Sequence, residues 1–63
     1  SAFSDREIEI LNHIQKGLKT KEIAQILFLS PDTISTHRRN ILKKAGKVTM
    51  SQIIFKLNNS GII

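Results

Sequence analysis

Apolar residues recur at helical spacing in the first part of the chain, between residues that begin and end helices. Ile8 and Leu11 stand three residues apart and predict one buried face of a helix. Ser4 precedes them and is followed three residues later by a glutamate, a pairing typical of a capping box. Gly17 is expected to end this helix, because glycine adopts the left-handed conformation at little cost.

Residues that typically begin and end helices predict three further helices. Thr20 is the expected N-cap of a very short second helix. Ser30 stands before a proline and an aspartate, which predicts a third helix over about 31–45. Thr49 begins a fourth helix with a second capping box, and residues 58–61 end it. We therefore predict an all-α fold of four short helices.

The second and third helices, joined by three residues, match a helix-turn-helix. At about 100° per residue, Ile34 and Ile41 lie on one stripe of the third helix. The opposite side carries polar and basic residues: Ser35, Thr36, Arg39, Asn40 and Lys43. An α-helix fits the major groove of DNA, where arginine and asparagine can contact guanine and adenine edges bidentately. The third helix is therefore the candidate reading element.

The net charge of +5 is unevenly distributed. Residues 1–32 contain five acidic and four basic residues, whereas residues 33–63 contain six basic residues and no acid. Such a cluster suits a polyanion: DNA, RNA or an anionic membrane surface. A solvated, merely solubilising helix face is the alternative explanation of the charge alone.

Length and composition exclude several classes. A chain of 63 residues has little room for a deep catalytic cleft, and it contains no acid/base pair, nucleophile dyad or phosphate loop. We expect no enzyme activity and no cofactor. The absence of cysteine rules out disulfide scaffolds and thiolate zinc sites, and we assign neither His13 nor His37 to a metal. The longest apolar run is four residues, so no membrane span is expected.

In these residues the chain resembles the LuxR/GerE-type helix-turn-helix domain of bacterial transcription regulators. The matching stretches run in order along nearly the whole chain: Ser4–Glu7, Ile10–Leu11, Gly17, Lys21–Ala24, Leu27, Leu29–Ser30, Thr33–Ile34, His37, Asn40–Ile41, Lys44, Gly46 and Gly61–Ile63. The resemblance implies a third helix that enters the major groove, in a dimer bound to paired half-sites. It also implies a cytoplasmic protein of the response-regulator or ligand-sensing kind, with RNA polymerase as a further partner.

Residue roles follow from the same resemblance, position by position. The base-reading positions correspond to Ser35, Thr36 and Arg39, to which the helix geometry adds Asn40. The phosphate-binding positions correspond to a second set: Thr20, Lys21, Thr33, Arg38, Lys43 and Lys44. Two interpretations stay open for Phe55 on the fourth helix. Its ring packs under Ile62 and Ile63 if these residues fold back, or it forms part of a homodimer surface.

Other expectations concern organisation and competing functions. We expect residues 1–63 to form one domain of a longer protein, since no initiator methionine is present. The family resemblance implies that this domain is the C-terminal part of a regulator. Glu22 is expected to tether helices through a basic neighbour. A sigma-factor-like promoter-recognition module is the nearest alternative, although the fourth helix and the Gly61–Ile63 ending disfavour it. A protein-interaction module that reuses the fold is the other.

Overall fold

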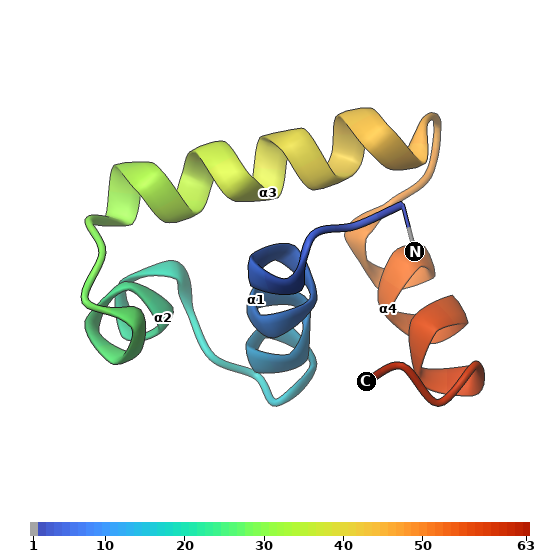
Figure 1. Ribbon diagram of the computed structural model, residues 1–63, viewed down its shortest axis with the longest axis horizontal. Coiled ribbons are helices and arrows are strands. Elements are labelled where there is room, and N and C mark those ends of the chain that lie inside the picture. The colour runs from blue at the N-terminus through green and yellow to red at the C-terminus, as the bar shows by residue number, and fades with distance from the viewer. Residues whose placement is uncertain (1) are drawn as a thin grey trace.

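The computed structural model describes residues 2–63, so Ser1 lies outside the described part of the chain. Its helices are α1 (Asp5–Gln15), α2 (Thr20–Leu27), α3 (Pro31–Ala45) and α4 (Met50–Asn59). The longest helix, α3, runs along one side of the molecule, with α2, α1 and α4 arranged beside one another along its length (Figure 1). No strand occurs between residues 2 and 63, and the all-α prediction is confirmed.

Local hydrogen bonds begin the helices largely where the sequence predicts. The Ser4 hydroxyl accepts from the backbone N–H of Glu7 at 3.1 Å, and the Glu7 carboxylate accepts from the Ser4 N–H at 2.8 Å. Thr49 and Gln52 form the same reciprocal pair at the start of α4. Each pair satisfies two backbone donors that have no partner within the helix. Both predicted capping boxes are therefore confirmed.

The predicted cap of α2 is wrong by one residue. Lys19 is the N-cap, with extended backbone angles, and Thr20 is the first helical residue. The Glu22 carboxylate accepts from the Lys19 N–H at 2.8 Å, because it stands three residues beyond the cap. Glu22 is exposed and serves this local role, so the expectation that it tethers two helices is also wrong.

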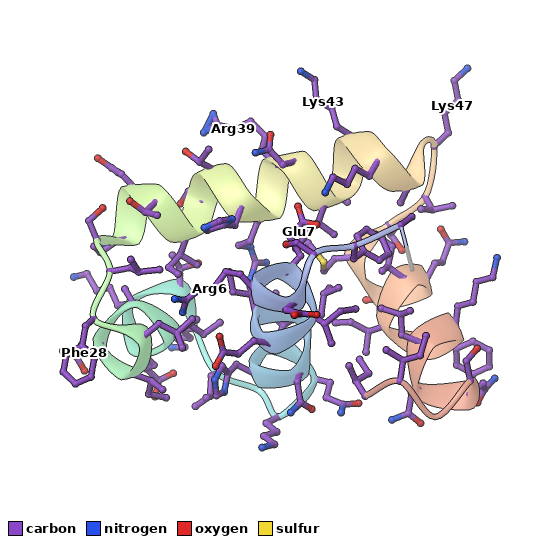
Figure 2. All side chains as sticks on the ribbon, in the orientation of Figure 1. Arg6, Glu7, Phe28, Arg39, Lys43 and Lys47 are labelled. Carbon is purple, nitrogen blue, oxygen red and sulfur yellow. The ribbon has the colours of Figure 1, made fainter. Side chains whose placement is uncertain are left out.

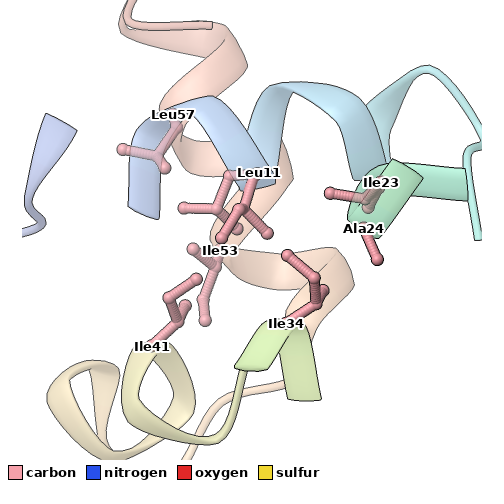
Figure 3. Close-up of a cluster of buried hydrophobic side chains, with 8 residues drawn as sticks. Leu11, Ile23, Ala24, Ile34, Ile41, Ile53 and Leu57 are labelled. Carbon is pink, nitrogen blue, oxygen red and sulfur yellow. The ribbon is translucent and has the colours of Figure 1, made fainter. Parts of the chain in front are cut away.

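One apolar cluster holds the four helices together (Figure 3). α3 contacts both α1 and α2, and α1 also contacts α4. Each helix contributes two buried residues to the cluster: Ile10 and Leu11, Ile23 and Ala24, Ile34 and Ile41, and Ile53 and Leu57. Because the core is this small, each of these side chains carries a large share of the buried apolar surface.

The turn between α2 and α3 is short and tightly bonded. Phe28 ends α2 in the left-handed conformation, with φ of 56° and ψ of 40°. The next amide, of Leu29, donates to the Ala24 carbonyl at 2.9 Å. This reversal places Ser30 at the N-cap of α3, where its hydroxyl accepts from the Thr33 N–H. The turn therefore directs α3 across α2 as a helix-turn-helix requires.

The C-terminal residues after α4 turn back as predicted, but only partly into the core. The Ile62 amide donates to the Leu57 carbonyl at 3.0 Å, and Ile63 packs against the apolar cluster. Ile62 itself stays 45% exposed. Phe55 is 69% exposed, so its ring is not buried under these two residues. The structure therefore disfavours the interpretation in which Phe55 packs under Ile62 and Ile63.

Candidate nucleic-acid interface

One side of α3 is exposed to solvent, and we call it the outer face. It consists of five exposed residues: Ser35, Thr36, Arg39, Asn40 and Lys43. On the opposite side, Ile34 and Ile41 are completely buried. Ile34 and Ile41 are seven residues, or about two helical turns, apart, so they lie on the same side of α3. The residues of the outer face project from the opposite side and face solvent. Arg39 and Lys43 extend away from the helices beneath, in the same direction as Lys47 (Figure 2).

Hydrogen bonds along the outer face orient the reading side chains. The Thr36 hydroxyl donates to the Asp32 carbonyl one turn earlier, at 3.0 Å. An Arg39 N–H donates to that hydroxyl in turn, at 3.5 Å. The second distance is at the limit for a hydrogen bond, so it aligns the guanidinium along the helix without holding it firmly. Arg39 can therefore redirect its planar fork of donors to another acceptor.

Two helix N-termini bring the predicted phosphate contacts Thr20, Lys21 and Thr33 into position. Thr20 and Lys21 occupy the first two positions of α2, with Lys21 exposed. Thr33 lies in the first turn of α3, and its hydroxyl is 2.9 Å from that of Ser30. Unpaired backbone amides and the helix dipole make such ends favourable for a phosphate. The three residues thus lie at helix N-termini, and their contact with phosphate stays a prediction.

The remaining predicted phosphate contacts, Arg38, Lys43 and Lys44, are arranged differently from one another. Arg38 is half-buried on the flank of α3, as its place near the buried stripe predicts. Lys43 is exposed on the outer face. Lys44 instead extends to α1, where its ammonium donates to the Glu7 carboxylate at 2.6 Å. The structure therefore brings Lys44 to a protein carboxylate rather than leaving its charge free.

Glu7 is the residue whose importance the sequence reasoning missed. The sequence predicts only a capping role for Glu7, yet this residue is 4% exposed and pairs with a lysine 37 positions away. The hint was present: Glu7 lies one helical turn before Ile10 and Leu11, on the buried face of α1. A carboxylate in that place needs a cationic or hydrogen-bonding partner, because burying an unpaired charge is costly.

Opposing effects set the pKa of the Glu7 carboxyl. Burial by itself raises the pKa, because it disfavours the charged form. The hydrogen bond from Lys44, those from the Ser4 amide and hydroxyl, and the positive charge of Lys44 all lower it. The lowering effects prevail, so the pKa lies below its ordinary value of 4.5. The folded state therefore favours the ionised carboxylate.

Acidification should remove the stabilisation that this carboxylate provides. Because the folded pKa lies below 4.5, the contribution is complete above that pH and is lost as pH falls through the folded pKa. Glu7→Gln should lower the free energy of unfolding at neutral pH by roughly 1–2 kcal/mol and flatten its decline in acid. Urea unfolding across the acid range measures both effects. Glu9→Gln, an exposed change on the same helix, should leave the acid decline intact; equal behaviour of the two variants would contradict the assignment.

Among residues 2–63, no group of three histidine, aspartate or glutamate side chains is placed to hold a metal ion. No helix in the same part of the chain is long and apolar enough to cross a membrane.

Comparison with known proteins identifies the family. Residues 1–57 match the model of the bacterial regulatory proteins of the luxR family, which are DNA-binding transcription regulators and not enzymes. The chain is 41% identical over 52 residues to the Fimbriae Z protein of Salmonella typhimurium, covering 82% of this chain and 25% of that protein. It is 37% identical over 62 residues to the transcriptional regulatory protein YxjL of Bacillus subtilis, covering 97% and 28%.

A third relative is the nitrate/nitrite response regulator protein NarP of Escherichia coli, 39% identical over 44 residues, which cover 70% of this chain and 20% of that protein. The chain thus spans about a quarter of the length of the curated relatives that it matches. No solved structure gave a significant match. With its helix-turn-helix and its family match over nearly all residues, the chain belongs to the luxR family of bacterial regulatory proteins and is a DNA-binding domain of the transcription-regulator type.

Proposed function

We propose that this domain binds duplex DNA sequence-specifically, with α3 in the major groove. The observation that carries the proposal is the division of α3 into a buried apolar side and the exposed outer face. In this arrangement Arg39 contacts a guanine edge and Asn40 an adenine edge, the pairings that suit their donors and acceptors. Ser35 and Thr36 contact the groove through hydroxyl or methyl groups, or through bridging water.

Phosphate contacts position the domain on the duplex. We assign them to five residues: Thr20, Lys21, Thr33, Arg38 and Lys43. Contacts of this kind fix register and orientation, and carry little sequence information. They also make binding sensitive to salt, because each neutralised phosphate releases condensed counterions. The excess of basic over acidic residues from position 33 onward supports this assignment.

We further propose that the active species is a homodimer on paired half-sites, joined through α4. The exposed ring of Phe55, 69% accessible on that helix, supports a surface that a second copy covers. A single domain presents few phosphate contacts, so a dimer gains affinity by linking two half-sites. The chain corresponds to about a quarter of the length of its relatives, which supports a place as one domain of a longer regulator. We place it at the C-terminus of a cytoplasmic regulator that acts on RNA polymerase, as the family resemblance implies.

Selection from random duplexes tests this function. The dimerised domain should recover a palindromic consensus, since operator symmetry mirrors the two-fold symmetry of the protein. Titration of the recovered duplex at low and moderate salt should give binding tighter than that of an unrelated duplex at both concentrations. Recovery of unrelated sequences, with binding no stronger than that of a generic polycation, would favour a protein-interaction module instead.

A further inference from the structure

Two adjacent lysines near the C-terminal end of α3 have different surroundings. Lys43 is exposed on the outer face and extends away from the protein (Figure 2). Lys44 follows about 100° further around the helix. Its side chain is 42% exposed, and its ammonium lies 2.6 Å from the Glu7 carboxylate. Although both lysines have the same charge and are neighbours in sequence, only Lys44 is paired with a buried acid.

Lys44 would gain little binding free energy by exchanging the Glu7 carboxylate for a DNA phosphate. The exchange replaces one anion at 2.6 Å by another, and leaves a carboxylate that is 4% exposed without its cation. Breaking one half of a buried charge pair is costly, because the other half stays desolvated. As long as Lys44 stays paired with Glu7, its ammonium neutralises no phosphate and therefore releases no counterion from DNA. Lys44 is therefore a poor phosphate ligand in this fold.

The pair connects two elements that are distant in sequence. Glu7 accepts from the Ser4 amide as part of the cap of α1, and its carboxylate also accepts from Lys44 in the last turn of α3. The hydrogen bonds thus run from the beginning of α1 to the end of α3, two helices that are in contact. Charge-assisted hydrogen bonds are short and directional, so they restrict the angle at which α3 crosses α1.

We infer that Lys44 is a positioning residue, which holds the C-terminal half of α3 through Glu7, and that it does not bind a DNA phosphate. The inference rests on the proposed DNA-binding function and replaces the phosphate contact that the sequence predicts for Lys44. In this arrangement the register of Arg39 and Lys43 on the duplex depends on Glu7, which itself lies away from the DNA. Glu7 is then a positioning residue as well.

Salt dependence of DNA binding distinguishes positioning from phosphate contact. The double variant Glu7→Gln/Lys44→Gln keeps the net charge of the domain and retains a neutral donor and acceptor at the pair. On the duplex recovered by selection, its slope of log affinity against log salt should equal that of the unaltered domain. Lys43→Gln, the matched control, should lower the slope by about 0.9. A similar decrease in the double variant would overturn the inference.

Single substitutions of Lys44 test whether its ion pair with Glu7 sets the orientation of α3 in which the DNA bases are contacted. Lys44→Gln should weaken binding to the selected duplex by about twofold to thirtyfold, the range for substitutions that act without touching the ligand. Binding to an unrelated duplex should stay unchanged, and Lys44→Arg should restore the specific affinity. Measurements are made at a temperature where circular dichroism shows each variant to be folded. If Lys44→Gln does not fold, the salt slope of the double variant and the specific affinity of Lys44→Arg test the inference instead.

The outcomes separate this inference from the function on which it rests. A folded Lys44→Gln domain with unaltered specific affinity would make the pair a matter of stability alone and overturn the positioning role. Equal losses on both duplexes would overturn it too. Failure of the unaltered domain to prefer any duplex would instead overturn the proposed function.

Discussion

Arg39→Ala should weaken binding to the preferred duplex by roughly 5- to 150-fold, or about 1–3 kcal/mol, and relax discrimination at one base pair. The guanidinium lies exposed on the outer face of α3, and its bond to Thr36 is weak at 3.5 Å. It can therefore give up that bond for a guanine edge at little cost, and its loss removes a bidentate pair. Competition binding with duplexes altered at each position measures both effects.

Lys21→Ala is the control for Arg39→Ala. Lys21 is exposed at the start of α2, where the proposed contact is to phosphate and not to a base. Its loss should weaken all duplexes about equally and lower the salt slope by about 1. If both substitutions cause the same uniform loss, the distinction between reading and positioning contacts is wrong. Since both side chains are exposed, thermal unfolding should be little affected by either change.

Ile41→Ala should lower the free energy of unfolding by about 2–5 kcal/mol. Ile41 is completely buried on the inner side of α3 and belongs to the apolar cluster that joins the four helices (Figure 3). Truncation removes apolar contacts and leaves a cavity that a domain of 63 residues has little surrounding structure to fill. Urea unfolding of the variant measures the loss as a lower midpoint at a similar slope.

Ile26→Ala deletes the same atoms at a different place and is the matched control. Ile26 lies on α2 and is 48% exposed, so its truncation leaves no cavity. Alanine also has the highest helix propensity, which offsets part of the lost apolar contact. We expect a change of less than about 1 kcal/mol. Equal destabilisation by the two substitutions would contradict the assignment of Ile41 to the core.

The starts and ends of helices were predictable where they depend on neighbouring residues. The capping box of Ser4 needs only a glutamate three residues later, and Gly46, with φ of 86°, ends α3 where the sequence predicts. The exception at α2 has a local reason as well. Lysine is a poor N-cap by its own side chain, so the sequence favours Thr20. The Glu22 carboxylate nevertheless accepts from the backbone amide of Lys19, which makes Lys19 the cap.

The exposed outer face of α3 was also predictable, because helix geometry relates each outward residue to an inward one. Once Ile34 and Ile41 are assigned to the core, Thr36, Arg39 and Lys43 must face solvent. Which of the nearby cations remain available was not predictable in this way. Lys43 and Lys44 differ only in their angle around α3, and the sequence contains no local information about what lies opposite each of them.

The sequence by itself determined four helices, the N-caps of α1, α3 and α4, and the amphipathic division of α3, since these depend on spacings of three to seven residues. Only the tertiary structure decided that Lys44 pairs with Glu7 and that the ring of Phe55 stays in solvent. Both depend on how helices distant in the chain cross one another. Hydrogen bonds within a turn are specified by adjacent side chains, whereas a contact across 37 residues follows from the packing of the whole core.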